Sequence, residues 1–379
     1  MIEGTLGRWI GRENAALRHL DPILVITALA LSVFGVIMVY SASHNLANEL
    51  TGDQGFFLNK QIVSLMLGLI AMIVVATFDY RLAKVYAFLG FGALLFLLLL
   101  VLTPIGDETA GAQRWITLFG FQFQPSEFAK ITMVAALAAY LSEIKAEVRL
   151  DHVWRTAGIA AAPMGLIFLQ PDVGTMMVFA ATLIALLVVA GARARYIAIL
   201  LLTAIFLGIV AFHIGIVKDY QIARLTSFLD PAADPLRAGY NRQQAEIAIG
   251  SGGLFGRGFL AGTQTNLDFV PEQHTDFVFT VVGEEFGFAG AIFVLGLYGV
   301  LLWRGFRTAL MSRDSFGTLL AAGITAMLAF QVFVNIGMTM GIMPVTGIPL
   351  PLVSYGGTSM ITNWVAVGLL LNVHMRRFK

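Results

Sequence analysis

Long apolar stretches separated by short polar segments run along almost the whole chain. Ten of them approach the roughly 20 residues that a helix needs to cross a bilayer. They lie at 22–43, 60–78, 83–103, 125–141, 156–170, 174–190, 196–216, 277–303, 316–342 and 358–374. This pattern predicts an all-α, polytopic membrane protein with ten transmembrane helices, organised as one integral membrane domain over residues 1–379.

The composition supports a membrane protein. Of the 379 residues, 58% are hydrophobic and only 12% are charged, whereas soluble proteins carry about 25% charged residues. The chain has no cysteine, which excludes disulfides, thiolate chemistry and Cys-ligated zinc. The net charge of +1 gives no reason to expect a nucleic-acid partner. The first apolar run is too long for the core of a cleaved signal peptide, so we expect an uncleaved anchor.

The basic residues predict how the chain is oriented. If both termini face the cytoplasm, 16 of the 24 Lys and Arg residues lie on the cytoplasmic side, and every inside segment is basic. This distribution follows the positive-inside rule. It places residues 1–21 in the cytoplasm and makes 217–276 a long outer loop. Within that loop, 242–249 is expected to form a short helix at the membrane interface.

Ionisable residues gather at the predicted outer ends of the spans. They are Glu127, Lys130, Asp172, Asp276, Glu284 and Glu285. Such groups are costly in a membrane without a partner or a function. Two interpretations stay open. Glu127 and Lys130, which share a helix face, form an ion pair that only joins helices, or they line an outward-opening polar cavity with Asp172 and Asp276. One of Glu284 and Glu285 is expected to face this cavity or a neighbouring helix.

Two glycine-rich segments need a structural explanation. The first, 250–258, lacks the Lys-Ser/Thr ending of a phosphate-binding loop and no βαβ unit surrounds it, so we expect a flexible loop rather than a nucleotide site. The second, 341–359, contains three prolines and four glycines and is predicted to break the ninth helix. Its Ser354, Tyr355 and backbone amides suit sugar hydroxyls or phosphate oxygens, although a plain re-entrant loop fits the segment equally well.

A histidine-based metal site is not expected. His274 and Asp276 are two residues apart, whereas zinc ligands on a helix are typically four apart. The other histidines lie on other elements. A divalent cation, Mg²⁺ or Mn²⁺, held by carboxylates against a phosphate stays open.

Five segments together resemble the SEDS family (shape, elongation, division and sporulation). They are 124–130 (QPSEFAK), 170–175 (QPDVGT), 271–277 (PEQHTDF), 283–287 (GEEFG) and 344–357 (PVTGIPLPLVSYGG). They follow in order over nearly the whole chain and fit ten spans. The run PVTGIPLP resembles the rod-shape branch of the family rather than the division branch.

The resemblance implies a peptidoglycan glycosyltransferase that polymerises lipid II at the outer, periplasmic face of the bacterial cytoplasmic (inner) membrane during cell elongation. Its substrates are lipid II and undecaprenyl-linked glycan. Its partners are a class B penicillin-binding protein, which is a transpeptidase, the elongation machinery and membrane lipid. In the family, the aspartate that matches Asp276 is catalytic, and the residues that match Glu127, Lys130 and Asp172 line the central cavity.

This chemistry needs a base for the acceptor hydroxyl and positive charge for the leaving pyrophosphate. We expect Asp276 to be the base and Lys130 to hold pyrophosphate together with Arg114 or a loop arginine, Arg242 or Arg257. His274, Glu284, Ser354 and Tyr355 are further predicted substrate contacts. We expect inversion at the anomeric carbon. The alternatives are a lipid II flippase and a non-enzymatic scaffold; the outward clustering of the charges argues against the flippase.

Overall fold

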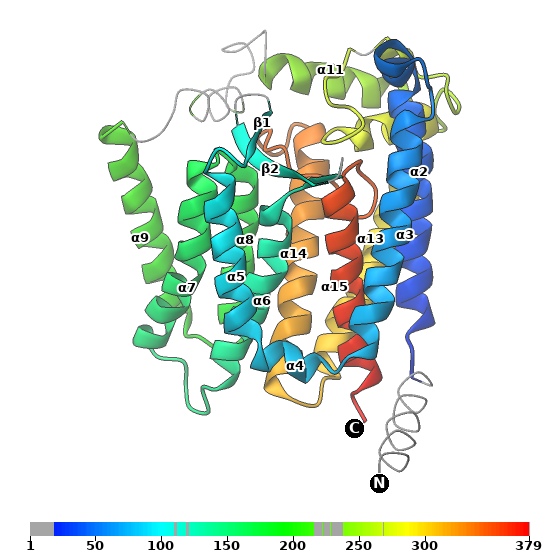
Figure 1. Ribbon diagram of the computed structural model, residues 1–379. Helices are drawn as coiled ribbons and strands as arrows, with labels where there is room; N and C mark the ends of the chain where they lie inside the picture. The colour runs from blue at the N-terminus through cyan, green and yellow to red at the C-terminus, as the bar shows by residue number, and fades with distance from the viewer. Residues whose placement is uncertain are drawn as a thin grey trace.

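The computed structural model describes residues 19–109, 112–118, 121–215, 222, 228, 238–267 and 269–378. The predicted cytoplasmic segment up to residue 18 and much of the first half of the predicted outer loop lie outside the described residues. Helices that run side by side form the body of the molecule (Figure 1). They are α2 (Pro22–Thr51), α3 (Phe56–Thr77), α4 (Tyr80–Val85), α5 (Ala87–Val101), α6 (Pro125–Ser142), α7 (Leu150–Leu169), α8 (Val173–Val189), α9 (Ala194–His213), α13 (Val278–Leu310), α14 (Ser315–Thr339) and α15 (Gly357–Met375).

Every predicted span coincides with helix, and the third is divided into α4 and α5. Among the described residues, α2, α3, α9, α13 and α14 are long and apolar enough to cross a membrane, and α5 and α8 are shorter apolar helices. The chain is therefore a multi-pass membrane protein. The count of ten crossings stays a prediction. The rings of His19 and Phe378 lie 5.0 Å apart, so the two ends of the described chain meet at one end of the bundle.

Small elements cover the opposite end of the bundle, which carries Asp276 and is called the outer end below. Three short strands form an antiparallel sheet in the order β1–β2–β3, at Asp107–Thr109, Ala112–Leu118 and Phe121–Phe123. The helices α11 (Ala238–Ser251) and α12 (Thr263–Asn266) lie at the same end. The helix expected at 242–249 is confirmed as part of α11, whereas the strands were not predicted because each is too short to show an alternating pattern.

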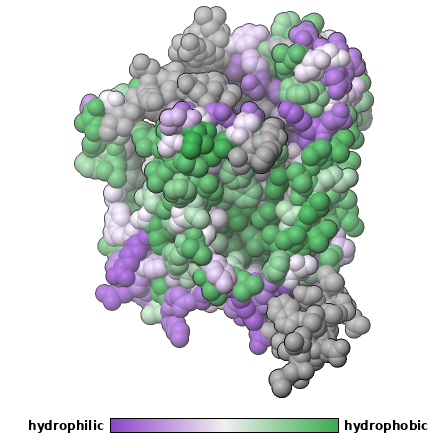
Figure 2. Space-filling model, viewed as in Figure 1, coloured by the Kyte–Doolittle hydropathy of each residue, from purple (hydrophilic) through white to green (hydrophobic). Residues whose placement is uncertain are grey.

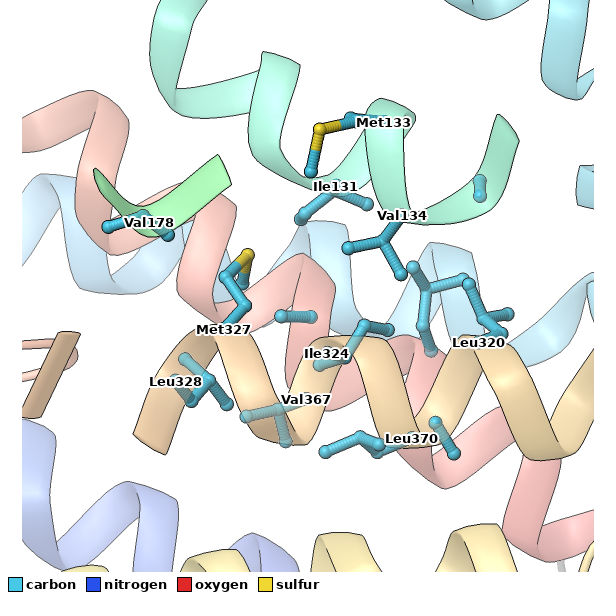
Figure 3. Packing of buried hydrophobic residues seen from close by; sticks show 14 of the residues in the cluster. Ile131, Met133, Val134, Val178, Leu320, Ile324, Met327, Leu328, Val367 and Leu370 are labelled. Atoms are coloured by element: carbon cyan, nitrogen blue, oxygen red, sulfur yellow. The ribbon is translucent and has the colours of Figure 1, made fainter. Parts of the chain in front are cut away.

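The apolar core lies between α6, α8, α14 and α15. Figure 3 shows side chains of the four helices interlocking, among them Val134, Val178, Ile324 and Val367. A Cβ on Gly323 would lie 2.7 Å from Val134, so the missing side chain lets α14 approach α6 closely. Figure 2 shows hydrophobic residues across the middle of the visible face and hydrophilic residues gathered toward its ends, as expected for a protein surrounded by lipid.

The run 341–359 ends the ninth helix, where the sequence predicted an irregular segment, rather than interrupting it. The ninth helix, α14, is continuous from Ser315 to Thr339, and the segment 341–356 that follows it is a non-helical connection to α15. The interior irregularity belongs to the eighth span, α13, where Gly287 has φ 63° and ψ −159°. Prolines and glycines end a helix, as the sequence predicted, but a single glycine inside an apolar span gave no comparable signal.

Candidate active site

Asp276 lies in the turn that leads into α13 and is half-buried. Its backbone N–H donates to the Glu272 carbonyl at 3.1 Å. The Asn335 side chain donates to the carbonyl oxygens of Asp276, at 2.8 Å, and Ile348, at 2.7 Å. A Cβ on Gly347 would lie 3.3 Å from Asp276 Oδ2. Asn335 therefore holds Asp276 against the 341–356 segment, and its carboxylate lies beside Gly347.

The predicted site residues His274 and Tyr355 come together beside Asp276. The Tyr355 N–H donates to the His274 carbonyl at 2.9 Å. The Phe57 ring lies 4.9 Å from His274 and 5.2 Å from Tyr355. Burial lowers the pKa of His274, which keeps the imidazole neutral near pH 7. Ser354 is used differently, because its hydroxyl accepts the Leu350 N–H at 2.9 Å within the connecting segment.

Glu127 and Lys130 form a buried ion pair in the first turns of α6. Lys130 Nζ lies 2.7 Å from Glu127 Oε1, and both side chains are at most 4% exposed. The second carboxylate oxygen of Glu127 and the hydroxyl of Ser126 are buried and find no hydrogen-bond partner among the residues that the structure describes. The side-chain amide of Gln331 on α14 is also buried and unpartnered. An ion pair that served only to join helices would leave fewer polar groups unsatisfied around it.

The turn between α7 and α8 is fixed by Asp172 and Arg114. The Asp172 carboxylate caps α8 by accepting the Thr175 N–H at 3.1 Å and the Thr175 hydroxyl at 2.8 Å. Arg114, on β2, donates to the carbonyls of Gln170, at 3.0 Å, and Pro171. A Cβ on Gly174 would lie 2.8 Å from the Thr346 carbonyl. The 346–348 backbone therefore separates the start of α8 from Asp276.

Glu284 and Glu285 both bind protein groups. Glu284 accepts four hydrogen bonds, from the Gln264 N–H (2.8 Å), the Thr265 N–H (2.9 Å), the Thr265 hydroxyl (2.7 Å) and the Thr263 hydroxyl (3.3 Å). Glu285 accepts from the Ser41 hydroxyl and, at 3.2 Å, from the Leu260 N–H. Glu284 thus anchors α12 to α13. We therefore do not carry it into the proposed substrate site, although the sequence suggested it.

The glycine-rich segment 250–258 fills the break in α13. At the break, the N–H groups of Phe288 and Ala289 donate to the carbonyls of Gly253 and Leu254. In return, the N–H groups of Arg257 and Gly258 donate at 3.0 Å to the carbonyls of Glu284 and Glu285. The backbone groups that Gly287 removes from the helix are thus paired again. This part of the outer loop is ordered by α13 rather than flexible.

We expect Gly256→Ala to destabilise the outer end. Gly256 has φ +80°, and a Cβ there would overlap the Glu285 carbonyl. We expect a loss of about 2 kcal/mol in stability from backbone strain and the broken pairing, measured as a lower thermal unfolding temperature in detergent. Gly296→Ala is the matched control, because a Cβ on Gly296 meets nothing within 4 Å. Equal unfolding temperatures of the two variants would contradict the docking described here.

Asn335 is the site residue that the sequence analysis missed. A buried amide within an apolar span was a usable signal, and Gln331 stands one turn before it on the same helix face. Asn335 and Phe57 contact predicted site residues but lie outside the five segments that resemble the family. Those segments alone therefore do not reveal them.

We expect Asn335→Leu to reduce polymer synthesis by about tenfold or more while the protein remains folded. Leucine keeps the volume but removes the side-chain donor that Asn335 gives to the carbonyls of Asp276 and Ile348, which costs about 1–3 kcal/mol. The comparison is Thr339→Val, one turn along α14, whose hydroxyl donates only within its own helix, to Ile336. Rates are measured on purified protein at matched folded fractions. Wild-type activity of Asn335→Leu would show that Asn335 does not position Asp276.

Within the part of the chain that the structure describes, no group of three or more His, Asp or Glu side chains converges as the ligands of a metal ion do. The residues around Asp276 therefore do not form a complete ligand set of their own, and no step proposed below passes through a metal.

Comparison with known proteins gives a consistent match. The profile of the FtsW/RodA/SpoVE family, described as cell cycle proteins, matches residues 22–379. Stage V sporulation protein E of Bacillus subtilis (strain 168) is 42% identical over 93% of this chain and 96% of its own length. Peptidoglycan glycosyltransferase MrdB of Escherichia coli (strain K12) is 38% identical over 95% of this chain and 94% of its own.

A solved structure agrees with both relatives. It is titled "Structural coordination of polymerization and crosslinking by a peptidoglycan synthase complex", and one of its chains is 35% identical, with a TM-score of 0.80 over 95% of this chain and 99% of that one. The identities to the sporulation relative and to MrdB are close, so they do not assign a branch of the family. The chain belongs to the FtsW/RodA/SpoVE family of multi-pass membrane proteins, which is the SEDS family.

Proposed function

We propose that this protein is a peptidoglycan glycosyltransferase that polymerises lipid II into glycan strands at the outer face of the cytoplasmic membrane. The observation that carries the proposal is the setting of Asp276, a half-buried carboxylate whose backbone is fixed by Asn335 beside the 341–356 segment. The name of MrdB, a peptidoglycan glycosyltransferase, supports the reaction class.

In the proposed reaction, Asp276 takes the proton of an acceptor sugar hydroxyl. The freed oxygen attacks the anomeric carbon of the donor sugar, a new glycosidic C–O bond forms, and the bond to the lipid pyrophosphate breaks. Attack opposite the leaving group inverts the configuration, so no covalent glycosyl-enzyme is needed. The neutral imidazole of His274, two residues before Asp276, and the hydroxyl of Tyr355, whose ring lies 5.6 Å from that of His274, are the proposed contacts for sugar hydroxyls.

The leaving pyrophosphate needs positive charge. Among the predicted cations, Arg242 is paired with Glu246 at 2.8 Å, and Lys130 is paired with the buried Glu127. Arg114 and Arg257 form no ion pair within the described residues; each donates to neutral oxygens instead. We therefore propose that Arg114 and Arg257 provide net positive charge, while Lys130 provides a donor that Glu127 holds in place.

The proposed orientation puts both termini in the cytoplasm and Asp276 in the periplasm, with ten crossings between them. The basic inside segments support it, as does the meeting of His19 and Phe378 at the end opposite Asp276. The related synthase complex couples polymerisation to crosslinking, which supports a class B transpeptidase as the partner. The PVTGIPLP run at 344–351 supports a role in cell elongation.

A sided polymerisation assay tests the function. The purified protein is reconstituted into vesicles, lipid II is supplied on one face only, and products are separated on a gel. We expect glycan polymer when lipid II reaches the Asp276 face, and more of it when the transpeptidase is present. A parallel arm with chelator measures the need for Mg²⁺ or Mn²⁺. If lipid II moved to the other face and no polymer formed, the protein would be a flippase. If neither movement nor polymer were observed, the scaffold alternative would stand.

A further inference from the structure

Arginines outnumber acids where α2, α13 and α15 meet, at the end of the bundle opposite Asp276. Asp21 caps α2 and is fully engaged by Arg304, with Nε at 2.8 Å and Nη2 at 2.6 Å from the same carboxylate oxygen. The Thr308 hydroxyl lies 3.4 Å from His374, so α13 and α15 are in contact here. Asp21 is thus paired with Arg304 and forms no ion pair with Arg307 or Arg377.

Two of those arginines have no acidic partner. Arg307 is exposed, lies 6.0 Å from the centre of the Trp303 ring, and forms no ion pair or side-chain hydrogen bond within the described residues. Within the described part of the chain, the Arg377 guanidinium donates to the His374 ring and lies 4.7 Å from the centre of the Phe378 ring, and its buried Nε has no acceptor there. Arg307 precedes Thr308, whose hydroxyl lies 3.4 Å from His374. Arg377 donates to the same His374 ring at 3.0 Å, so the two arginines flank one contact between α13 and α15. Burial and the positive charge of Arg307 lower the pKa of Arg377, and the charge of Asp21 opposes this shift.

The neighbouring Arg376, by contrast, is hydrogen-bonded to protein acceptors on two helices. It donates to the carbonyl of Thr77 at 2.7 Å and to the Asn372 side chain at 2.6 Å, and so fastens α15 to α3. A favourable interaction with the helix dipole accounts for a basic residue near each helix C-terminus. It does not account for two neighbouring arginines that form no ion pair with an acid among the described residues.

Large aromatic side chains stand next to this pair and face away from the bundle. Trp303 and Phe306 on α13 are each 56% exposed. Tryptophan favours the boundary between lipid tails and headgroups, so these rings mark the level at which phosphates of the bilayer lie. Unpaired arginines beside exposed aromatic rings at that level match a phosphodiester with acyl chains attached.

We propose that Arg307 and Arg377 bind the phosphate of an anionic phospholipid from the leaflet at this end, with Trp303 and Phe306 lining the path of its acyl chains. The charge distribution assigns this end to the cytoplasm. The site is separate from the proposed catalytic site, and its occupation does not depend on the polymerase function.

Native mass spectrometry on the full chain tests the proposal. The protein is purified in mild detergent, and phosphatidylglycerol or phosphatidylcholine is titrated in. We expect saturable binding of phosphatidylglycerol, and roughly 30-fold weaker binding by Arg307→Gln/Arg377→Gln, since each basic side chain near the surface contributes about fivefold. The control is Arg193→Gln/Arg195→Gln, which removes the same charge from exposed positions at the start of α9.

Each other outcome overturns the proposal. Equal losses in both double variants would show that net charge alone attracts the lipid. Unchanged binding by Arg307→Gln/Arg377→Gln would show that the pair is not the site. Inorganic phosphate at the same phosphorus concentration should not raise the unfolding temperature as phosphatidylglycerol does; equal protection would indicate a soluble anion. If the double variant fails to fold, the single Arg307→Gln variant, at an exposed position, must still bind about fivefold more weakly.

Discussion

Purified Asp276→Asn protein is expected to make about 10²- to 10⁴-fold less glycan polymer than the wild type, at unchanged yield and unfolding temperature. The amide keeps the size of the side chain but cannot accept a proton, and removing a general base typically costs 10²–10⁴-fold in rate. The backbone of residue 276 is held by the Glu272 carbonyl and the Asn335 side chain, and both bonds persist in the variant. Gel analysis of lipid II products measures the effect.

Glu49→Gln provides the matched control. Glu49 is exposed near the outer end of α2, so this variant removes one negative charge from the same side of the membrane without touching the proposed site. We expect it to retain wild-type activity. If Asp276→Asn were as active as Glu49→Gln, Asp276 would not be the base, and the mechanism proposed here would fail even if the protein proved to be a polymerase.

The helices were predictable from sequence because lipid imposes a simple rule. Each crossing must satisfy its own backbone hydrogen bonds and be apolar over a fixed length, so every predicted span coincides with helix. What surrounds the helix ends follows no such rule. The β1–β3 sheet and the docking of 250–258 on Gly287 depend on pairing between segments that are distant or irregular. A single sequence carries little information about such pairing.

The same difference applies to the site. The charged residues are easy to identify in the sequence. The structure then shows that they have different roles. Asp276 has the exposure that a base requires, whereas Glu284 is saturated by four donors from residues 263–265. Both are acids near the mouth of one span, and the structure distinguishes them by the burial of Glu284 and by the four donors that hold it. Asn335 is uncharged, yet it connects the two backbone segments that hold the proposed base.

Breaking the buried pair on α6 is expected to destabilise the protein strongly. Lys130→Met leaves the Glu127 carboxylate buried without its cation, and such a change typically costs about 3–5 kcal/mol. Replacing both residues, as Glu127→Gln/Lys130→Met, removes the two buried charges together. The double variant should therefore regain most of the stability lost by the single one. Thermal unfolding in detergent, with the wild type and both variants side by side, measures this recovery.

The activity of the double variant then decides between the two roles that the sequence left open. An ion pair that only joins helices predicts that activity returns together with stability. We expect a folded protein that does not polymerise lipid II.

Antiparallel packing of α6 and α14, with Gly323 against Val134, places Gln331 about two turns outward, level with Glu127. The unpartnered amide of Gln331, the free oxygen of Glu127 and the Ser126 hydroxyl thus lie at one depth. Native proteins rarely leave such groups unsatisfied unless a substrate or water completes them. Full activity in a stable double variant would assign the pair to helix packing alone.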